Sequence, residues 1–386
     1  MKAPRFSLLA LCCAAALAFF ACRPETHAND DWPRGTLVIA RKDALQRVLT
    51  RLQRLDGTPL AKLAAELDAT LPDCAWLEGR VESGPPAEVW RRLRCRGLES
   101  AFPGLDRERD GREIAFALPE EAGERIVGSI AVSENADVDV EVLLPQSTFS
   151  DGVALALPGD EAPGPTLLSA RDELVHLRVR PAGGLDIASL VPASSQGDQL
   201  FRLKSELFAG TVLDGTWEAV IYLPEEGDAM PPSALAVGFS LKRPAVAAME
   251  RFITDIETAW PVRRSAFGFG SADGACLLDL NLLPGLAPCY VATEHALVIG
   301  WNPASVRRAL APGGEDDTDA ALGATGGIVI ELDRIPAADA HFAKLVSAEE
   351  RRAVDRSYPW RRLTAGGERD GDGVRLRVRL DVGAGA

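Results

Sequence analysis

Residues 136–144 read ADVDVEVLL and alternate apolar with mainly acidic side chains. The apolar series is Val138, Val140, Val142 and Leu144, and the intervening series is Asp137, Asp139, Glu141 and Leu143. A period of two residues is that of a β-strand, in which successive side chains point to opposite faces. The stretch therefore predicts a half-exposed strand with an acidic outer face, of the kind that antiparallel sheets contain.

The same alternation occurs in two other parts of the chain. Val175, Leu177 and Val179 alternate with His176, Arg178 and Arg180, which predicts a second half-exposed strand with His176 on the exposed face. Near the C-terminus, the turn sequence Asp370-Gly371-Asp372-Gly373 precedes an alternation of apolar residues with arginines, which predicts a terminal hairpin. These repeats favour antiparallel pairing.

Helical periodicity is confined to a few segments. Leu45, Val48, Leu49 and Leu52 recur at the spacing of one helix face, and Thr58-Pro59 supplies a cap and first-turn proline for a second helix. Further helices are expected at 198–208, after Pro244, after Asn302-Pro303, and at about 337–354. The fold class predicted is α+β, with mostly antiparallel sheets and flanking helices.

The length of 386 residues suggests one large domain or two ordinary ones. The turn-rich stretch 224–232 (PEEGDAMPP) is the best linker or long-turn candidate, so we expect α+β domains at 32–224 and 225–386. The segment LVIA (37–40) with its following helix can be aligned on LVIG (297–300) with its helix. Either an internal duplication produced two related halves, or two short apolar matches arose by chance.

The N-terminus has the pattern of a secretory signal. Lys2 and Arg5 precede an uncharged stretch, residues 6–21, that is shorter than the roughly 20 residues a membrane-spanning helix needs. Residues 1–21 are therefore expected to direct export. The chain's formal charge of −14 becomes −16 once Lys2 and Arg5 are removed, which argues against nucleic-acid partners and against electrostatic docking on anionic lipid.

The sequence Phe19-Phe20-Ala21-Cys22 resembles the lipobox of bacterial lipoproteins, in which cleavage leaves Cys22 to be acylated. Phe19 and Phe20 depart from the usual residues, and cleavage after Ala28 is the competing interpretation. If Cys22 is acylated, residues 22–31 form a polar tether, and more than one acyl chain gives a stable membrane anchor. Arg23 is not the aspartate that retains lipoproteins in the inner membrane of enteric bacteria, so this analogy favours the outer membrane.

The cysteines support the same compartment. Cys12, Cys13 and Cys22 belong to the leader or its end, which leaves an even set in the body. Four cysteines allow three pairings, and sequence proximity favours Cys74–Cys95 and Cys276–Cys289. Disulfides are expected because an exported chain meets an oxidising environment, whereas a zinc site would need closer spacings and nearby histidines.

No motif in the sequence predicts a catalytic, cofactor-binding or metal-binding site. The segment 268–274 has the wrong spacing for a nucleophile elbow or a dinucleotide-binding turn, and it is expected to be a turn before Cys276. The four histidines are not at metal-ligand spacing, and the Asp370–Gly373 turn departs from a calcium loop. The acidic cluster 315–319 is expected to be a solvated loop, and the low aromatic content of 6% lowers the expectation of a glycosidase.

Residues 290–310 (YVATEHALVIGWNPASVRRAL), with Tyr358-Pro359-Trp360 and the C-terminal hairpin, resemble a group of bacterial exported and lipoprotein domains of unknown function. The shared feature is a hairpin followed by glycine, a polar cap and a short helix, and the resemblance implies no activity. The sequence favours a non-catalytic envelope lipoprotein that binds an envelope protein or an apolar ligand, without a cofactor. The alternatives are an exported hydrolase with an unfamiliar site, and a lipid or lipoprotein carrier.

Overall fold

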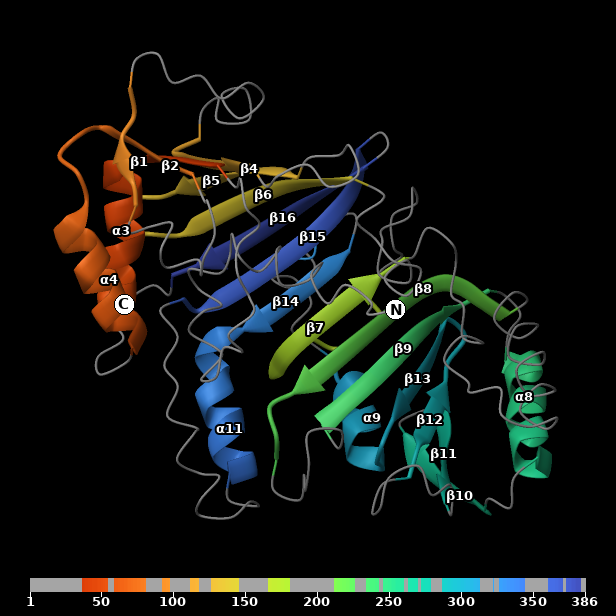
Figure 1. The fold of residues 1–386 in the computed structure, drawn as a ribbon. Helices are drawn as coiled ribbons and strands as arrows, with labels where there is room; N and C mark the ends of the chain where they lie inside the picture. The colour runs from red at the N-terminus through yellow and green to blue at the C-terminus, as the bar shows by residue number, and fades with distance from the viewer. Residues whose placement is uncertain are drawn as a thin grey trace. The chain divides into compact units, whose positions relative to one another are not determined.

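The computed structural model (Figure 1) divides the chain into two units: unit 1 is Met1–Ser150 with Asp355–Ala386, and unit 2 is Asp151–Val354. The residues that the structure describes are 37–54, 59–80, 92–97, 112–117, 126–145, 166–180, 212–225, 234–242, 246–259, 263–269, 272–278, 287–312, 322, 326–343, 360–370 and 373–382. Residues 1–36, which hold the predicted signal, tether and Cys22, lie outside this set.

Unit 1 contains an antiparallel run of strands in the order β3-β2-β1-β4-β5-β6-β16-β15. Their bounds are β1 Leu37–Arg41, β2 Trp76–Arg80, β3 Arg94–Cys95, β4 Ile114–Ala117, β5 Val127–Val132, β6 Val138–Pro145, β15 Arg362–Asp370 and β16 Gly373–Asp381. The strand predicted at 136–144 is thus β6, and it pairs with the last strand of the chain.

Two helices follow β1 directly, α3 (Lys42–Gln53) and α4 (Pro59–Thr70), and they lie side by side (Figure 1). The face of α3 that the sequence predicted to be apolar is buried: Leu45, Val48, Leu49 and Leu52 are all almost inaccessible to solvent. Unit 1 therefore covers part of its sheet with the helical pair that the sequence predicts.

A network of ion pairs covers the polar face of β6 and β16. The register places Glu141 opposite Arg377 and Asp139 opposite Arg379, so the acidic series of one strand faces the arginines of the other. The Glu141 carboxylate contacts Arg375, Arg377 and Arg112, with Nη1 of Arg375 as its closest partner and the other two at 3.5 Å. Glu141 is the centre of this network, whereas Asp139 reaches Arg379 only at 4.0 Å.

We predict that Glu141→Gln lowers the free energy of unfolding by about 1–2 kcal/mol, because three arginines lose a half-buried common partner. The matched control is Asp139→Asn on the same strand face, with an expected loss of under about 0.5 kcal/mol. Urea unfolding measures both, and the gap between them should shrink in 1 M salt. Equal losses for the two variants would contradict this account of the network.

Unit 2 contains a second antiparallel run, in the order β10-β11-β12-β13-β9-β8-β7-β14. The bounds are β7 Glu173–Val179, β8 Leu213–Tyr222, β9 Leu235–Leu241, β10 Arg263–Phe269, β11 Ala272–Leu278, β12 Cys289–Ala292, β13 Ala296–Gly300 and β14 Gly327–Glu331; the helices are α8 Val246–Ala259, α9 Pro303–Ala309, the short 3₁₀ turn η6 Leu332–Arg334, and α11 Ile335–Ala343.

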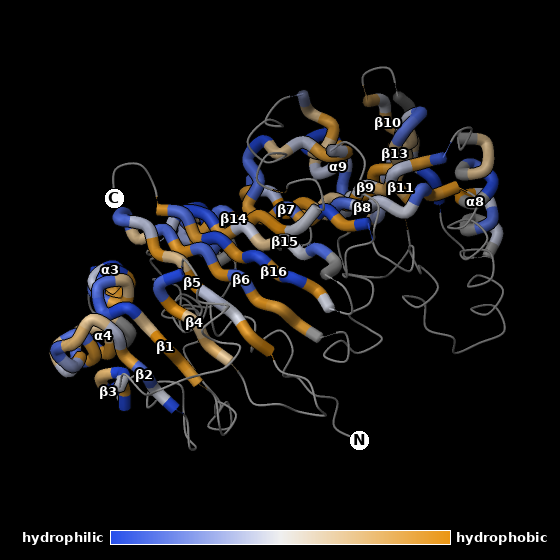
Figure 2. Tube along the Cα trace, turned by 90° about the horizontal axis from the view of Figure 1, so that it is seen from above, coloured by the Kyte–Doolittle hydropathy of each residue, from blue (hydrophilic) through white to orange (hydrophobic). Residues whose placement is uncertain are grey.

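Both faces of the unit 2 sheet are packed at β13. Val298 lies in a core cluster with Val306 of α9, and its neighbour Leu297 lies in a second cluster with Ile253 of α8. Adjacent residues of a strand point to opposite faces, so α9 and α8 cover opposite faces of this sheet. In unit 1, by contrast, the hydropathy colouring shows apolar and polar residues alternating along β6 and β16 (Figure 2).

The expected fold class is confirmed in its coarse form: antiparallel strands dominate the described residues, and a few helices flank them. Residues 224 and 225, where the sequence places a domain boundary, lie within unit 2 between two paired strands, β8 and β9. The expected helix at 198–208 lies outside the described residues. None of the helices in the described part of the chain is long and apolar enough to cross a membrane.

One strand is oriented against expectation. In β7 the polar residues His176 and Arg178 are buried, while Val175 and Leu177 on the other face are only half-buried. The prediction of an exposed His176 was therefore wrong. The reason is that the α9 face of the sheet, onto which His176 projects, is covered by a further segment and holds buried charges of its own.

Candidate functional site

Residues Thr166–Ala170, which we call the strap, lie across the α9 face of the unit 2 sheet. Leu168 is fully buried, and it occupies the space above Gly238 of β9, where a Cβ atom would lie 2.8 Å from Leu168 Cδ2. The backbone N–H of Ser169 donates to the carbonyl oxygen of Ala309 at the end of α9, at 2.7 Å. The strap is thus held between the sheet and α9.

Glu218 of β8 binds the strap from the side of the sheet. Its side chain is fully buried, and its Oε2 accepts the backbone N–H groups of Leu167 and Leu168 at 3.0 Å each. Two successive amides directed at one carboxylate oxygen compensate part of the cost of burying its charge. Within the described residues its other oxygen, Oε1, is buried without a hydrogen-bond partner.

His176 of β7 lies between two carboxylates. Its Nδ1 is 2.9 Å from Glu173 Oε2 and its Nε2 is 3.4 Å from Glu218 Oε2, and all three side chains are almost completely buried. Burial by itself lowers the pKa of His176, but the hydrogen bonds and charges of Glu173 and Glu218 outweigh it and raise the pKa to about 9. At neutral pH the ring is therefore an imidazolium that donates to both carboxylates.

Two further side chains bond to the strap, and a third, Arg308, packs against one of them. Arg178 Nη1 donates to Thr166 Oγ1 at 2.7 Å, and the Tyr222 hydroxyl donates to the carbonyl oxygen of Ser169 at 3.0 Å. Burial raises the pKa of Tyr222, so this hydroxyl stays protonated. Arg308 of α9 lies 5.5 Å from the Tyr222 ring centroid and donates to the carbonyl oxygen of Leu223.

The side chains of Glu173, His176 and Glu218 bond to one another and to the strap. Both imidazole nitrogens face carboxylates, and the carboxylate nearest the strap accepts backbone amides, so these groups already have protein partners. General acid–base catalysis requires a group within reach of a substrate proton. No group of histidine, cysteine and carboxylate side chains suited to a metal ion occurs among the described residues.

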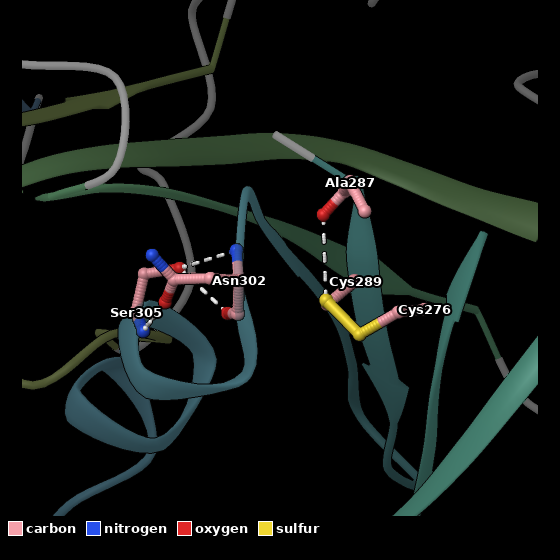
Figure 3. Close-up of a disulfide and its surroundings, with 5 residues drawn as sticks. All are labelled: Cys276, Ala287, Cys289, Asn302 and Ser305. Atoms are coloured by element: carbon pink, nitrogen blue, oxygen red, sulfur yellow. Dashed lines mark hydrogen bonds between the residues drawn. A yellow bond between two sulfur atoms is a disulfide. The ribbon is translucent and has the colours of Figure 1, made fainter. Parts of the chain in front are cut away.

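A disulfide lies beside α9 on the same face. Cys276 of β11 and Cys289 of β12 face each other directly in the register, and both are buried in the core cluster that includes Val306 (Figure 3). Next to it, the Asn302 side chain caps α9 by accepting the Ser305 backbone N–H at 2.7 Å. In return the Ser305 hydroxyl oxygen accepts the Asn302 backbone N–H at 3.4 Å, which completes a capping box (Figure 3).

The disulfide pairing is confirmed. Cys74–Cys95 joins the residues before β2 to β3, and Cys276–Cys289 joins β11 to β12. Cys22 and the acidic cluster 315–319 lie outside the described residues. His295 lies in the turn between β12 and β13, and His341 lies in α11.

The sequence interpretation missed Glu173, Glu218, Tyr222 and Arg308. One signal was available in β8, where Trp217, Ala219 and Ile221 form one apolar series while Glu218 shares the other series with Val220 and Tyr222. A strand that is apolar on both sides is buried on both faces, and a lone carboxylate in it must have internal partners. That pattern could have identified Glu218 but not its partners, which come from separate segments.

Comparisons with known proteins do not add a family: no protein-family model, curated protein or solved structure matches this chain.

We predict that unit 2 becomes less stable at alkaline pH, where the imidazolium of His176 loses its proton. Because the pKa of His176 is raised on folding, its contribution is complete below pH 6.5 and is lost as the pH rises through about 9. The loss should approach about 3 kcal/mol by pH 10 in urea unfolding experiments.

His176→Gln should be destabilised at pH 7 by about 3–5 kcal/mol, because two buried carboxylates lose their cation. It should also lose the decline of stability between pH 7 and 10. His295→Gln, at an exposed turn, is the matched control and should keep the wild-type profile. If His176→Gln and wild type decline in parallel, His176 is not the titrating group.

The two disulfides should differ in their access to reductant. Cys95 is exposed and Cys74 is half-buried, whereas Cys276 and Cys289 are buried in the core. We expect dithiothreitol without denaturant, followed by iodoacetamide, to label Cys74 and Cys95 at least about tenfold faster, because exchange requires access to the sulfur. Peptide mass spectrometry measures both rates, and equal labelling would show that the unit 2 core opens readily.

Proposed function

We propose that this chain is a non-catalytic binding or scaffold module of the bacterial cell envelope. In this proposal residues 1–21 direct export, Cys22 carries the lipid anchor, and the body faces the periplasm from the outer membrane. Its partner is an envelope protein or an apolar ligand.

The observation that carries the non-catalytic part is that Glu173, His176 and Glu218 are buried and bond to one another and to the strap. Among the described residues this cluster brings together the types of group that acid–base enzymes use, yet each group bonds to the protein itself. Its geometry fits a structural role, in which buried charge fixes the strap on the sheet. A hydrolase would instead need the histidine or a carboxylate directed at an open cleft.

The disulfides support the exported part of the proposal. Each unit contains one, and disulfides persist in oxidising compartments such as the bacterial periplasm. The leader pattern, read from the sequence, points to the same compartment independently. The anchor rests on the lipobox resemblance at Cys22, and Arg23 supports the outer membrane by analogy.

We also propose that an internal duplication produced two related halves of the chain. Its support is the pair of aligned segments, β1 with α3 and β13 with α9, which both form a buried strand that leads into a helix. In each case the strand pairs antiparallel with a neighbour on both sides.

Mass spectrometry of the mature N-terminus tests the location. After expression of the full chain in a Gram-negative host and membrane fractionation, we expect a first residue Cys22 bearing acyl groups, in the outer-membrane fraction. A free N-terminal Asn29 would remove the anchor and leave soluble export. An intact Met1 in the cytosolic fraction would overturn both export and anchoring.

The same preparation tests the activity. We expect no turnover of ester, peptide, glycoside or phosphoester substrates by wild type. Turnover that disappears in His176→Gln, with circular dichroism unchanged, would overturn the non-catalytic assignment and favour a hydrolase. Organic extraction of the native protein, followed by mass spectrometry, asks whether an apolar ligand co-purifies; a stoichiometric lipid would favour the carrier form of the proposal.

A further inference from the structure

The disulfide of unit 1 joins an exposed cysteine to a half-buried one. Cys95 lies in β3, the two-residue strand that ends the unit 1 run, and it is exposed to solvent. Cys74 lies in the turn before β2, and it is half-buried. The two sulfurs of this bond therefore differ in their access to a reagent dissolved in the surrounding water.

The backbone around Cys74 is held against the beginning of α3. The N–H of Cys74 donates to the carbonyl oxygen of Pro72 at 3.1 Å, and the N–H of Lys42 donates to the carbonyl oxygen of Ala75 at 3.0 Å. The Lys42 ammonium also pairs with the carboxylate of Asp73 at 3.2 Å. None of these contacts involves β3, so the turn that carries Cys74 remains in place when the disulfide opens.

The strand β3 has bonds to β2 that do not depend on the disulfide. The two strands pair antiparallel, and the N–H of Arg96 donates to the carbonyl oxygen of Trp76 at 3.0 Å. On the side-chain level, Nε of Arg94 donates to the buried carboxylate of Glu78 at 3.0 Å. These bonds keep Cys95 close to the turn before β2 after the sulfur–sulfur bond is broken.

This arrangement determines the direction of thiol–disulfide exchange. In such an exchange a thiolate attacks one sulfur and the other sulfur leaves, and the rate depends on access to the attacked sulfur. A thiolate from solvent reaches the exposed Cys95 first, so the new bond joins its sulfur to Cys95 Sγ. The old sulfur–sulfur bond breaks, and its electron pair leaves on Cys74 as a thiolate. The reverse attack by Cys74 on Cys95 Sγ expels the reagent as its thiolate and restores the disulfide.

We propose that Cys95 is a reversible thiolation site, at which a low-molecular-weight thiol forms a mixed disulfide while Cys74 serves as the resolving thiol. A group attached to Cys95 extends into solvent, whereas the unit 2 disulfide, Cys276–Cys289, is buried in the core and excludes such a group. The proposal goes beyond the binding or scaffold function and does not depend on it, because an acylated and a soluble form carry the same pair of cysteines.

Reduced glutathione is the probe for the wild-type protein. The oxidised full chain is incubated with it without denaturant, quenched at early times with excess N-ethylmaleimide, and mapped by peptide mass spectrometry. We expect glutathione on Cys95 and maleimide on Cys74, in at least about tenfold excess over the opposite isomer. Cys276–Cys289 is the internal control and should stay intact over the same period.

A matched pair of variants tests the two sulfurs separately. Cys74→Ser leaves Cys95 as a free thiol, and Cys95→Ser leaves Cys74. With oxidised glutathione we expect Cys74→Ser to form its mixed disulfide at least about tenfold faster. The wild-type measurement needs no variant, so it decides the question if either variant fails to fold.

Three results would overturn the proposal. The first is glutathione on Cys74 with maleimide on Cys95 in the wild-type protein. The second is the absence of any mixed disulfide at Cys95 during reduction. The third is equal rates for Cys74→Ser and Cys95→Ser, which would show that the difference in exposure does not direct the exchange.

Discussion

Unit 2 depends on one buried carboxylate. Glu218 lies on the buried face of β8, and its charge is tolerated because two strap amides and the His176 imidazolium surround one of its oxygens. Each of those partners is fixed by a different element: the strap by α9 and Tyr222, the imidazolium by β7 and Glu173. The cost of burying an unpaired charge exceeds that of losing an ordinary contact, so this interaction selects one arrangement of strap, sheet and helix.

Unit 1 also pairs charged side chains on its sheet, but there the charges remain in contact with solvent. Glu141 holds several arginines on a sheet face that stays partly wet, where each ion pair is screened and individually weak. What the opposed charges add there is register: a shift of β16 by one residue would turn its arginines toward the apolar face of the sheet. The two units thus use charge differently, for alignment in one and for internal attachment in the other.

The sequence predicted features that depend on neighbours along the chain. The period of two in β6, the apolar stripe of α3 and the Asn302-Pro303 cap all appear in the structure, because each is decided within a few residues. The cysteine pairing was also accessible, since short loops close readily. The failure at His176 has a physical reason: alternation in β7 shows two faces but not which one is covered, and that depends on the strap and α9. Glu218 had a local signal, whereas its connection to residues about 50 positions away did not.

The pairing of β6 with β16 has a consequence for how the protein is made. The two strands bracket the whole of unit 2 in the sequence, so a chain that emerges from its N-terminus must leave β6 with a bare edge until the last strands arrive. Unit 2 has all of its own strands by then and can form while unit 1 waits. During that interval the apolar face of β6 is accessible to chaperones and to other nascent chains. Loss of the final hairpin by proteolysis or a premature stop would leave the edge of β6 permanently unpaired. Damage at the C-terminus would therefore destabilise strands formed by the first part of the chain.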